Sequence, residues 1–100
     1  MTSGSDISVR DVGTVTVRYW GSARAAAGVD SDEVPVSPGA TLADVLASAL
    51  GLHAERPRLA AVVAVCSVLV GDRPVASADP AAVPVPAGET VELLPPFAGG

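Results

Sequence analysis

The sequence predicts an α+β roll, in which one main helix lies on a mixed sheet of four or five strands. Three observations support this fold class: short segments in which apolar and polar residues alternate, one amphipathic segment with a helix-capping signal, and a length of 100 residues, which suits a single domain. Hydrophobic residues make up 49% of the chain, which excludes a disordered protein. Because alanine and valine dominate among them, we expect a modest core and many strands.

Two strands are predicted in the first third of the domain, separated by a short helical segment. Apolar and polar residues alternate over 14–20, as in a strand with one buried face. The alanine-rich segment 23–27 predicts one or two helical turns, ended by Gly28. Residues 32–36 predict a second strand that pairs with the first. It is expected at a sheet edge, because Pro35 has no N–H to donate to a neighbouring strand.

The main helix is the most clearly marked element. Thr41 and Asp44 have the spacing of a capping box, in which each side chain bonds the backbone N–H of the other residue. The apolar residues that follow recur at the spacing of one helix face: Leu42, Val45, Leu46, Ala49 and Leu50. Gly51 predicts the end of this helix.

Three further strands are predicted in the second half of the chain. An apolar run rich in valine favours a strand over about residues 62–70. A short strand is expected at 83–85, inside a proline-rich connection, and a final strand at 90–94. Pro95 and Pro96 then end the last strand, because proline cannot donate to a sheet.

The charge and the composition exclude several classes of function. Eleven acidic residues against six basic ones give a net charge of −5, whereas nucleic-acid binding requires a basic surface. No apolar run reaches the ~20 residues of a membrane span, and the polar first residues lack the apolar segment of a secretory signal. With Cys66 as the single cysteine and no Cys/His cluster, neither an internal disulfide nor a metal site is indicated. We therefore expect a cytoplasmic domain with no bound metal or cofactor and no membrane partner.

The two glycines at the end of the chain are its most informative feature. We expect a flexible leader over 1–12, a domain over 13–94 and an extended tail over 95–100. Since glycine has no side chain, Gly99 and Gly100 can enter a narrow active-site slot and leave the terminal carbonyl unhindered. The alternative is a frayed end without function, because chain ends are commonly disordered.

Four segments resemble a known family: VRYWGSAR at 17–24, TLADVL at 41–46, CSVLV at 66–70 and LPPFAGG at 94–100. Together they resemble the MoaD/ThiS family of ubiquitin-like sulfur carriers, and most closely its MoaD branch, the small subunits of molybdopterin synthase. The resemblance extends over about residues 13–100 and implies a β-grasp (ubiquitin-like) fold.

The resemblance also implies a role in molybdenum cofactor biosynthesis. An E1-like adenylyltransferase would use ATP to activate Gly100, and a sulfur donor protein would then leave a thiocarboxylate there. The large subunit of molybdopterin synthase would bind the tail residues Pro95, Pro96, Phe97, Ala98 and Gly99, and the sulfur would pass to a pterin precursor. The chain would be the sulfur-donor subunit of a sulfurtransferase, and not a catalyst alone.

Three alternatives stay open at this point. A sulfur carrier for cysteine or thiazole synthesis uses the same chemistry, but its tail usually lacks the Pro-Pro-Phe sequence. A ubiquitin-like modifier would instead be joined through Gly100 to lysines of target proteins. A plain binding module would carry an inert tail.

Several other residues have a structural interpretation. Cys66 is expected to pack as a small hydrophobic residue in a strand, and His53 to lie in solvent just past a helix end. Trp20 is expected to pack in the core and Tyr19 at its edge. A solvated loop is expected to hold the acidic residues Asp30, Asp32 and Glu33.

Overall fold

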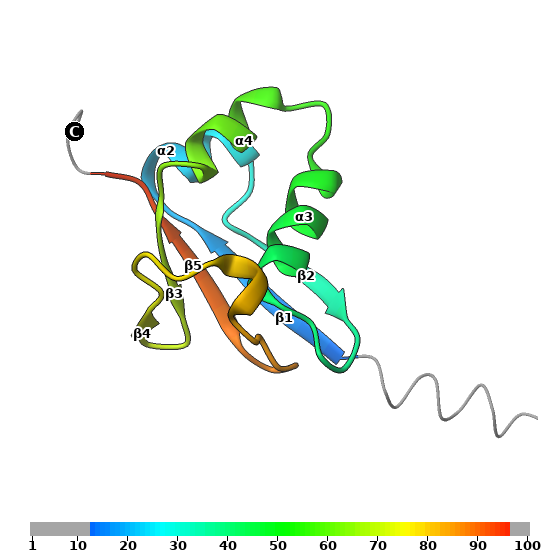
Figure 1. The fold of residues 1–100 in the computed structure, drawn as a ribbon. Coiled ribbons are helices and arrows are strands. Elements are labelled where there is room, and N and C mark those ends of the chain that lie inside the picture. The colour runs from blue at the N-terminus through cyan, green and yellow to red at the C-terminus, as the bar shows by residue number, and fades with distance from the viewer. Residues whose placement is uncertain (1–12, 97–100) are drawn as a thin grey trace, which may run out of the picture.

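The computed structural model describes residues 13–96 (Figure 1). Within this range a five-stranded mixed sheet has the strand order β2-β1-β5-β3-β4. The strands are β1 (Gly13–Tyr19), β2 (Ser31–Val36), β3 (Ser67–Val70), β4 (Arg73–Pro74) and β5 (Thr90–Leu94). The predicted leader over 1–12 and the last four tail residues, 97–100, lie outside the described residues.

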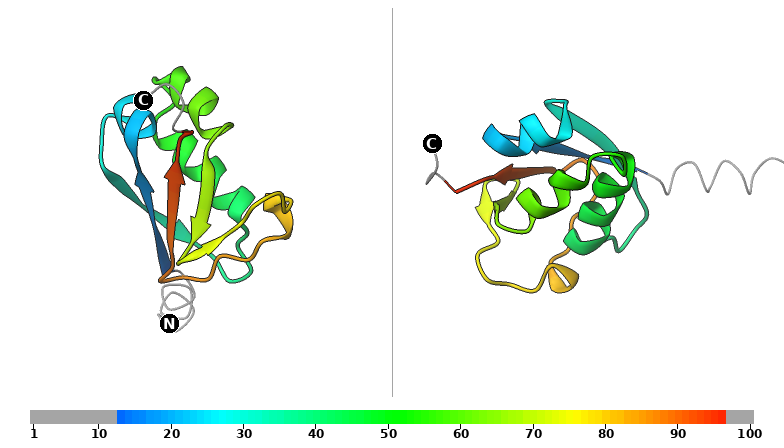
Figure 2. Two further views of the ribbon diagram at one scale, coloured as in Figure 1. Left: turned by 90° about the vertical axis from the view of Figure 1, so that its left-hand side faces the viewer. Right: turned by 90° about the horizontal axis from the view of Figure 1, so that it is seen from above.

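Three α-helices and one short 3-10 helix connect the strands within the described part of the chain. They are α2 (Gly21–Ala27), α3 (Leu42–Leu52), α4 (Pro57–Val63) and η1 (Pro80–Ala82). In the left view of Figure 2, β1, β5 and β3 lie in front of α3 and α4, so these two helices cover the far face of the sheet. The predicted α+β roll on a mixed sheet is confirmed.

The last strand occupies the centre of the sheet. β5 pairs parallel with β1 on one side and antiparallel with β3 on the other. β2 pairs only with β1 and forms one edge, as Pro35 predicts. The chain therefore leaves the sheet at residues 95–96 from its central strand, and not from an edge strand.

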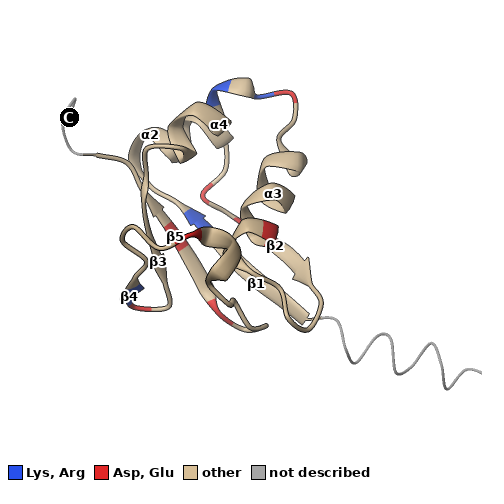
Figure 3. Cartoon of the chain, viewed as in Figure 1, with Lys and Arg blue, Asp and Glu red and all other residues tan. Residues whose placement is uncertain are grey.

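The core is made of small aliphatic side chains between the sheet and the helices. Its largest fully buried residues are Leu42, Leu59, Leu93, Val15, Val17, Val34, Val45, Val85 and Val91. Alternate residues of β1 are buried, as the sequence pattern predicts, and alternate residues of β5 are buried as well. No charged residue is fully buried between positions 13 and 96, and the charged positions are spread over the strands, helix ends and loops (Figure 3).

The start of α3 is confirmed, but its end is not where it was expected. Oγ1 of Thr41 accepts a hydrogen bond from the Asp44 N–H at 3.3 Å, and the Asp44 carboxylate accepts one from the Thr41 N–H at 2.9 Å. The prediction that Gly51 ends the helix is wrong, because Gly51 is itself helical and the helix continues to Leu52. Gly51 lacks the positive φ of a glycine cap, so nothing at this position forces the helix to stop.

The predicted strand over residues 62–70 is wrong in its first part, because the chain forms α4 there. Pro57 occupies the first turn of α4, where its missing N–H costs nothing. Leu59 is buried, and Val62 and Val63 pack against the core from the same helix face. Burial at helical spacing thus outweighs the β preference of valine, and only Ser67–Val70 is a strand.

The strand predicted at 83–85 is also wrong. The only pairing found there is an isolated bridge between Pro84 and Thr41, since the flanking prolines leave few N–H groups to donate. The 3-10 helix η1 precedes this segment, and the short strand β4 occurs earlier, at Arg73–Pro74. Val85 still contributes a buried side chain to the core.

Cys66 packs against the core as expected, although it does not lie in a strand. It is half-buried in the turn between α4 and β3. Burial raises the pKa of the Cys66 thiol. The thiol is therefore less ionised and less nucleophilic than that of an ordinary exposed cysteine.

Candidate functional site

The chain leaves the sheet after β5 at a position that its neighbours hold fixed. We call this position, at Pro95, the tail exit. β5 runs directly into Pro95, which is half-buried. A Cβ placed on Gly21 would lie 3.8 Å from Cγ of Pro95, so the proline ring lies next to the first residue of α2. Beside it, the Trp20 N–H donates a hydrogen bond to the carbonyl of Leu93 at 3.2 Å. The junction of β1 and α2 therefore positions the start of the tail.

The predicted site residues divide into two groups. Pro95 and Pro96 are described by the structure, and both follow β5 as the sequence predicts. The other predicted site residues lie outside the described residues: Phe97, Ala98, Gly99 and Gly100. Their roles therefore stay predictions.

Beside the tail exit, the sheet presents a face that neither α3 nor α4 covers (Figure 2, left). We call it the open face and define it by five residues: Arg18, Trp20, Leu69, Glu92 and Leu94. Strand pairing brings them together, because Glu92 lies between Arg18 on β1 and Leu69 on β3. Successive side chains of a strand point to opposite faces, so these residues point away from the buried Val91 and Leu93.

Trp20 is held in place on the open face. Its Nε1–H donates to Oε1 of Glu92 at 2.9 Å, and Cζ of Arg18 lies 4.8 Å from the centre of its ring. The side chain is 40% exposed, so the expectation that Trp20 packs in the core is wrong. Its place beyond Arg18, on the polar side of the β1 alternation, already indicated exposure. A preordered exposed aromatic next to apolar residues is typical of a protein interface.

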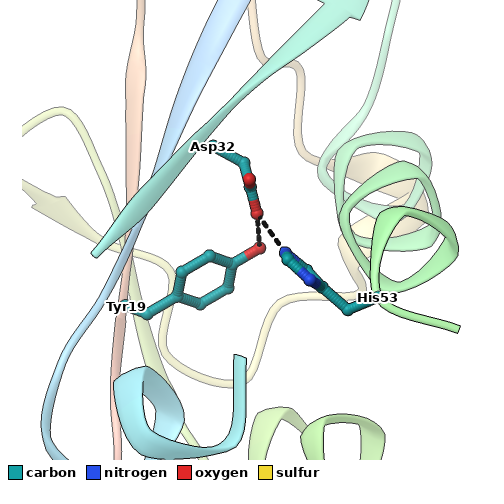
Figure 4. Close-up of polar contacts among 3 residues, drawn as sticks. All are labelled: Tyr19, Asp32 and His53. Carbon is teal, nitrogen blue, oxygen red and sulfur yellow. Dashed lines mark hydrogen bonds and ion pairs between the residues drawn. The ribbon is translucent and has the colours of Figure 1, made fainter. Parts of the chain in front are cut away.

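A second polar cluster lies on the helix-covered side of the sheet and consists of Tyr19, Asp32 and His53 (Figure 4). Oδ2 of Asp32 accepts a hydrogen bond from the Tyr19 hydroxyl at 2.8 Å and lies 2.6 Å from Nε2 of His53. The rings of Tyr19 and His53 meet edge to face, with their centres 6.0 Å apart. The cluster joins β1, β2 and the end of α3.

Two expectations are corrected here. His53 does not lie in solvent, since only 11% of its side chain is exposed, and Asp32 lies in β2 and not in a solvated loop. Asp32 shares its side of β2 with the buried Val34 and Val36, and this alternation is the signal that could have revealed it. Burial raises the pKa of the Tyr19 hydroxyl most, and the hydrogen bond to the Asp32 carboxylate raises it further.

Asp32→Ala is expected to lower the free energy of unfolding by about 1–3 kcal/mol, because the buried Tyr19 hydroxyl loses its acceptor. Chemical denaturation monitored by circular dichroism measures this change. Asp30→Ala is the matched control, since the Asp30 side chain forms an exposed ion pair with Arg24, whose loss should cost less than about 1 kcal/mol. An equal loss in the free energy of unfolding for Asp32→Ala and Asp30→Ala would mean that the cluster does not stabilise the fold.

Stability is also expected to fall in alkali. In the folded chain the pKa of Tyr19 is raised above its ordinary value of 10.0. The unfolded chain therefore loses this proton at a lower pH than the folded chain does. As a result, the free energy of unfolding falls as the pH rises above 10.0. Tyr19→Phe should flatten this decline, although it lowers stability at neutral pH. The Cys66 thiol titrates in the same direction, so both chains should carry Cys66→Ala. Identical alkaline slopes would exclude Tyr19 as the cause.

Residues 13–96 contain neither a helix long and apolar enough to cross a membrane nor a group of three or more His, Cys, Asp or Glu side chains that could hold a metal ion.

The comparison with protein families decides which family this is. Residues 17–100 match the model of the ThiS family, so the match runs from the middle of β1 to the last residue of the tail. The chain belongs to the ThiS family. The resemblance read from the sequence is thereby confirmed, and the ThiS-family chain is a ubiquitin-like protein of the sulfur-carrier and modifier type. No curated protein matches it significantly.

Solved structures support the same fold for this ThiS-family chain. It is similar to small archaeal modifier protein 1 (SAMP1) from Haloferax volcanii, with a TM-score of 0.73 and 25% identity, over 88% of this chain and 100% of the other. A Pyrococcus furiosus protein assigned as molybdopterin converting factor subunit 1 gives a TM-score of 0.68 and 22% identity, over 85% and 99% of the two chains.

A third structure is a complex of subunits 1 and 2 of the molybdopterin-converting factor from Helicobacter pylori. It gives a TM-score of 0.56 and 23% identity, over 87% of this chain and 99% of the matched chain. At this identity, the Pyrococcus and Helicobacter structures bear on the fold alone. The predicted β-grasp fold is confirmed.

Proposed function

We propose that this ThiS-family chain is a sulfur carrier, thiocarboxylated at Gly100, that serves as the small subunit of molybdopterin synthase. The observation that supports it most is the family match over residues 17–100, whose last segment reads Pro-Pro-Phe-Ala-Gly-Gly directly after the central strand β5. Among similar structures, one is assigned as subunit 1 of a molybdopterin converting factor and another is a complex of its subunits 1 and 2.

The proposed chemistry takes place at the terminal carboxylate. A carboxylate oxygen of Gly100 attacks the α-phosphorus of ATP on the activating enzyme, pyrophosphate leaves, and an acyl-adenylate forms. Hydrosulfide released by a donor protein then attacks the carbonyl carbon, a carbon–sulfur bond forms and AMP leaves. The product is a thiocarboxylate, which is ionised at neutral pH and is a soft nucleophile toward the pterin precursor.

The contribution of the chain is to position this reactive end. Pro95 lies against Gly21, and Pro95 and Pro96 restrict the backbone just beyond β5. The open face lies beside the exit and offers Trp20 and two half-buried leucines to a partner. A partner that binds this face receives the tail in a fixed direction. The reactive end is then already oriented, which lowers the entropic cost of the reaction.

The proposal includes two partners that take the tail in turn. An E1-like adenylyltransferase uses ATP, and the large subunit of molybdopterin synthase accepts the thiocarboxylate, so each must release the tail to the other. The carrier binds no cofactor of its own. Activation that consumes ATP, together with a lone half-buried Cys66, fits a cytoplasmic site for this cycle.

The experiment that tests the proposal is intact-mass analysis. The chain is co-expressed with the adenylyltransferase from its own genome and incubated with ATP and a sulfur donor. We expect a species whose mass corresponds to the exchange of one oxygen for sulfur, and its loss when the large subunit and the pterin precursor are added. A chain that carries only the ordinary carboxylate under all these conditions would contradict the carrier function.

A ubiquitin-like modifier is the second candidate, and one observation favours it: the similarity to SAMP1, at 25% identity over the whole of that chain. The same mass analysis separates the two functions. A modifier would be found joined through Gly100 to lysines of other proteins, whereas a carrier would be found as a free thiocarboxylate. A carrier for cysteine or thiazole synthesis would form the thiocarboxylate but would not bind the synthase large subunit.

A further inference from the structure

A cavity lies between α2 and the start of α4, and none of the functions above uses it. Its volume is about 300 Å³. We call it the α2–α4 groove, and it is lined by Ser22, Ala25, Ala26, Arg56, Pro57 and Arg58. Its walls come from segments about 30 residues apart in the sequence, which the packing of α2 against α4 brings together.

The groove places two arginine residues beside a small apolar surface. A Cβ placed on Gly28 would lie 2.8 Å from Cζ of Arg56, so the Arg56 head group lies directly over the backbone at the end of α2. Pro57 fixes the backbone between Arg56 and Arg58 at the first turn of α4. Ala25 and Ala26 of α2 supply the apolar part of the wall.

The charge of the groove is unusual for this chain. The net charge is −5, yet no carboxylate of residues 13–96 lines the groove, and the start of α4 shows as a basic segment in Figure 3. Within residues 13–96, the ion pairs are Arg24–Asp30 and His53–Asp32, and neither groove arginine takes part in one. Two arginines without a carboxylate partner are suited to a carboxylate from another molecule, because the guanidinium fork matches carboxylate geometry.

We propose that the α2–α4 groove binds an acidic segment of a partner protein. One Glu or Asp side chain lies between Arg56 and Arg58, and the adjacent aliphatic part of the segment packs on Ala25 and Ala26. The apolar wall favours a peptide over a free inorganic anion, which would leave that wall uncovered. The inference does not depend on sulfur chemistry, because it applies to any protein that receives the tail.

The position of the groove indicates when it is used. Ser22 in its wall follows Gly21, against which Pro95 lies, so the groove adjoins the tail exit. Trp20 of the open face directly precedes Gly21, so the open face also adjoins this exit. A partner that holds the tail can therefore contact both surfaces, and an acidic segment in the groove would add a charge requirement to the apolar recognition by the open face.

The test is a titration followed by nuclear magnetic resonance on the full ¹⁵N-labelled chain. The probe is the blocked peptide Ac-Ala-Glu-Leu-Glu-Ala-NH₂, with Gln in place of both Glu as its uncharged analogue. We expect the acidic peptide to shift the amides of Ser22, Ala25, Ala26 and Arg58 in a saturable, salt-sensitive way. The double variant Arg56→Gln/Arg58→Gln should raise its Kd about tenfold, since two charge pairs are lost.

Arg73→Gln is the matched control, because Arg73 is an exposed arginine of β4 outside the groove and should leave the Kd unchanged. If the double variant does not fold, Arg58→Gln alone should still weaken binding. Three results would overturn the proposal: equal binding of the Gln analogue, displacement of the peptide by inorganic phosphate at similar affinity, or no shifts in α2 and α4. A shift of the groove amides on deleting residues 97–100 would assign the groove to the chain's own tail instead.

Discussion

Gly99→Val is expected to abolish sulfur transfer and to leave the fold unchanged. In the proposed cycle the tail enters a narrow slot in both partners, and a β-branched side chain next to the reactive residue widens the chain and restricts its backbone. Displacing a reacting group by about 1 Å can cost about a hundredfold in rate, so we expect at least a loss of that order. The rate of thiocarboxylate formation, followed by intact mass, measures the effect, and thermal unfolding checks the fold.

Gly51→Val is the control for this experiment. Gly51 lies on the exposed side of α3, with nothing within 4 Å of an added Cβ, so the same substitution there should leave sulfur transfer intact. Adding one alanine after Gly100 should have the same effect as Gly99→Val, because the carboxylate is moved out of register. Normal transfer by either tail variant would rule out the role proposed for the two glycines.

Phe97→Ala is expected to weaken the complex with the synthase large subunit by about 2 kcal/mol or more, as truncation of an aromatic hot spot does. Phe97 is the one phenylalanine of the chain and lies three residues before the reactive end. Adenylation should change less, because the activating enzyme is expected to read the open face and the glycines. Isothermal titration calorimetry measures the change in Kd, which should be about thirtyfold.

A matched comparison makes this result specific. Trp20→Ala removes an aromatic from the open face and should weaken binding to the activating enzyme as well as to the large subunit. Val29 is an exposed aliphatic residue outside the open face and the tail. Val29→Ala should therefore weaken binding to neither the activating enzyme nor the large subunit. The chain should also be titrated with a sulfur-accepting cysteine-synthase partner. Tight binding to that partner alone would contradict the molybdopterin assignment.

The elements that could be predicted from the sequence are those whose signals are local. The capping box of Thr41 and Asp44 marks the start of α3, and alternation marks β1 and β5, because these patterns are complete within a few residues. α4 was missed since seven residues give fewer than two repeats of a helical pattern, and valine then favoured a strand. Pro57 marks both a break and a helix start, and local sequence does not separate the two.

The candidate site shows the same division. The tail was proposed as a site from the sequence alone, because its chemistry depends on residue types in order, and its role stays a prediction. The open face required knowing which side of the sheet the helices cover, and the Tyr19–Asp32–His53 cluster required the pairing of β1 with β2 and the end of α3. The α2–α4 groove arises only when two helices distant in sequence pack together. Such features depend on tertiary contacts, which no short pattern encodes.

Because β5 lies at the centre of the sheet, the open face exists only in the folded chain. An unfolded copy has the same Gly-Gly terminus as a folded one, so the terminus alone cannot tell a partner whether the chain is intact. Leu69 and Leu94 lie on β3 and β5, Trp20 directly follows β1, and the three become neighbours only after β5 has inserted between β1 and β3. An enzyme that requires this face together with the tail therefore spends ATP on completed molecules and leaves nascent or damaged chains unloaded.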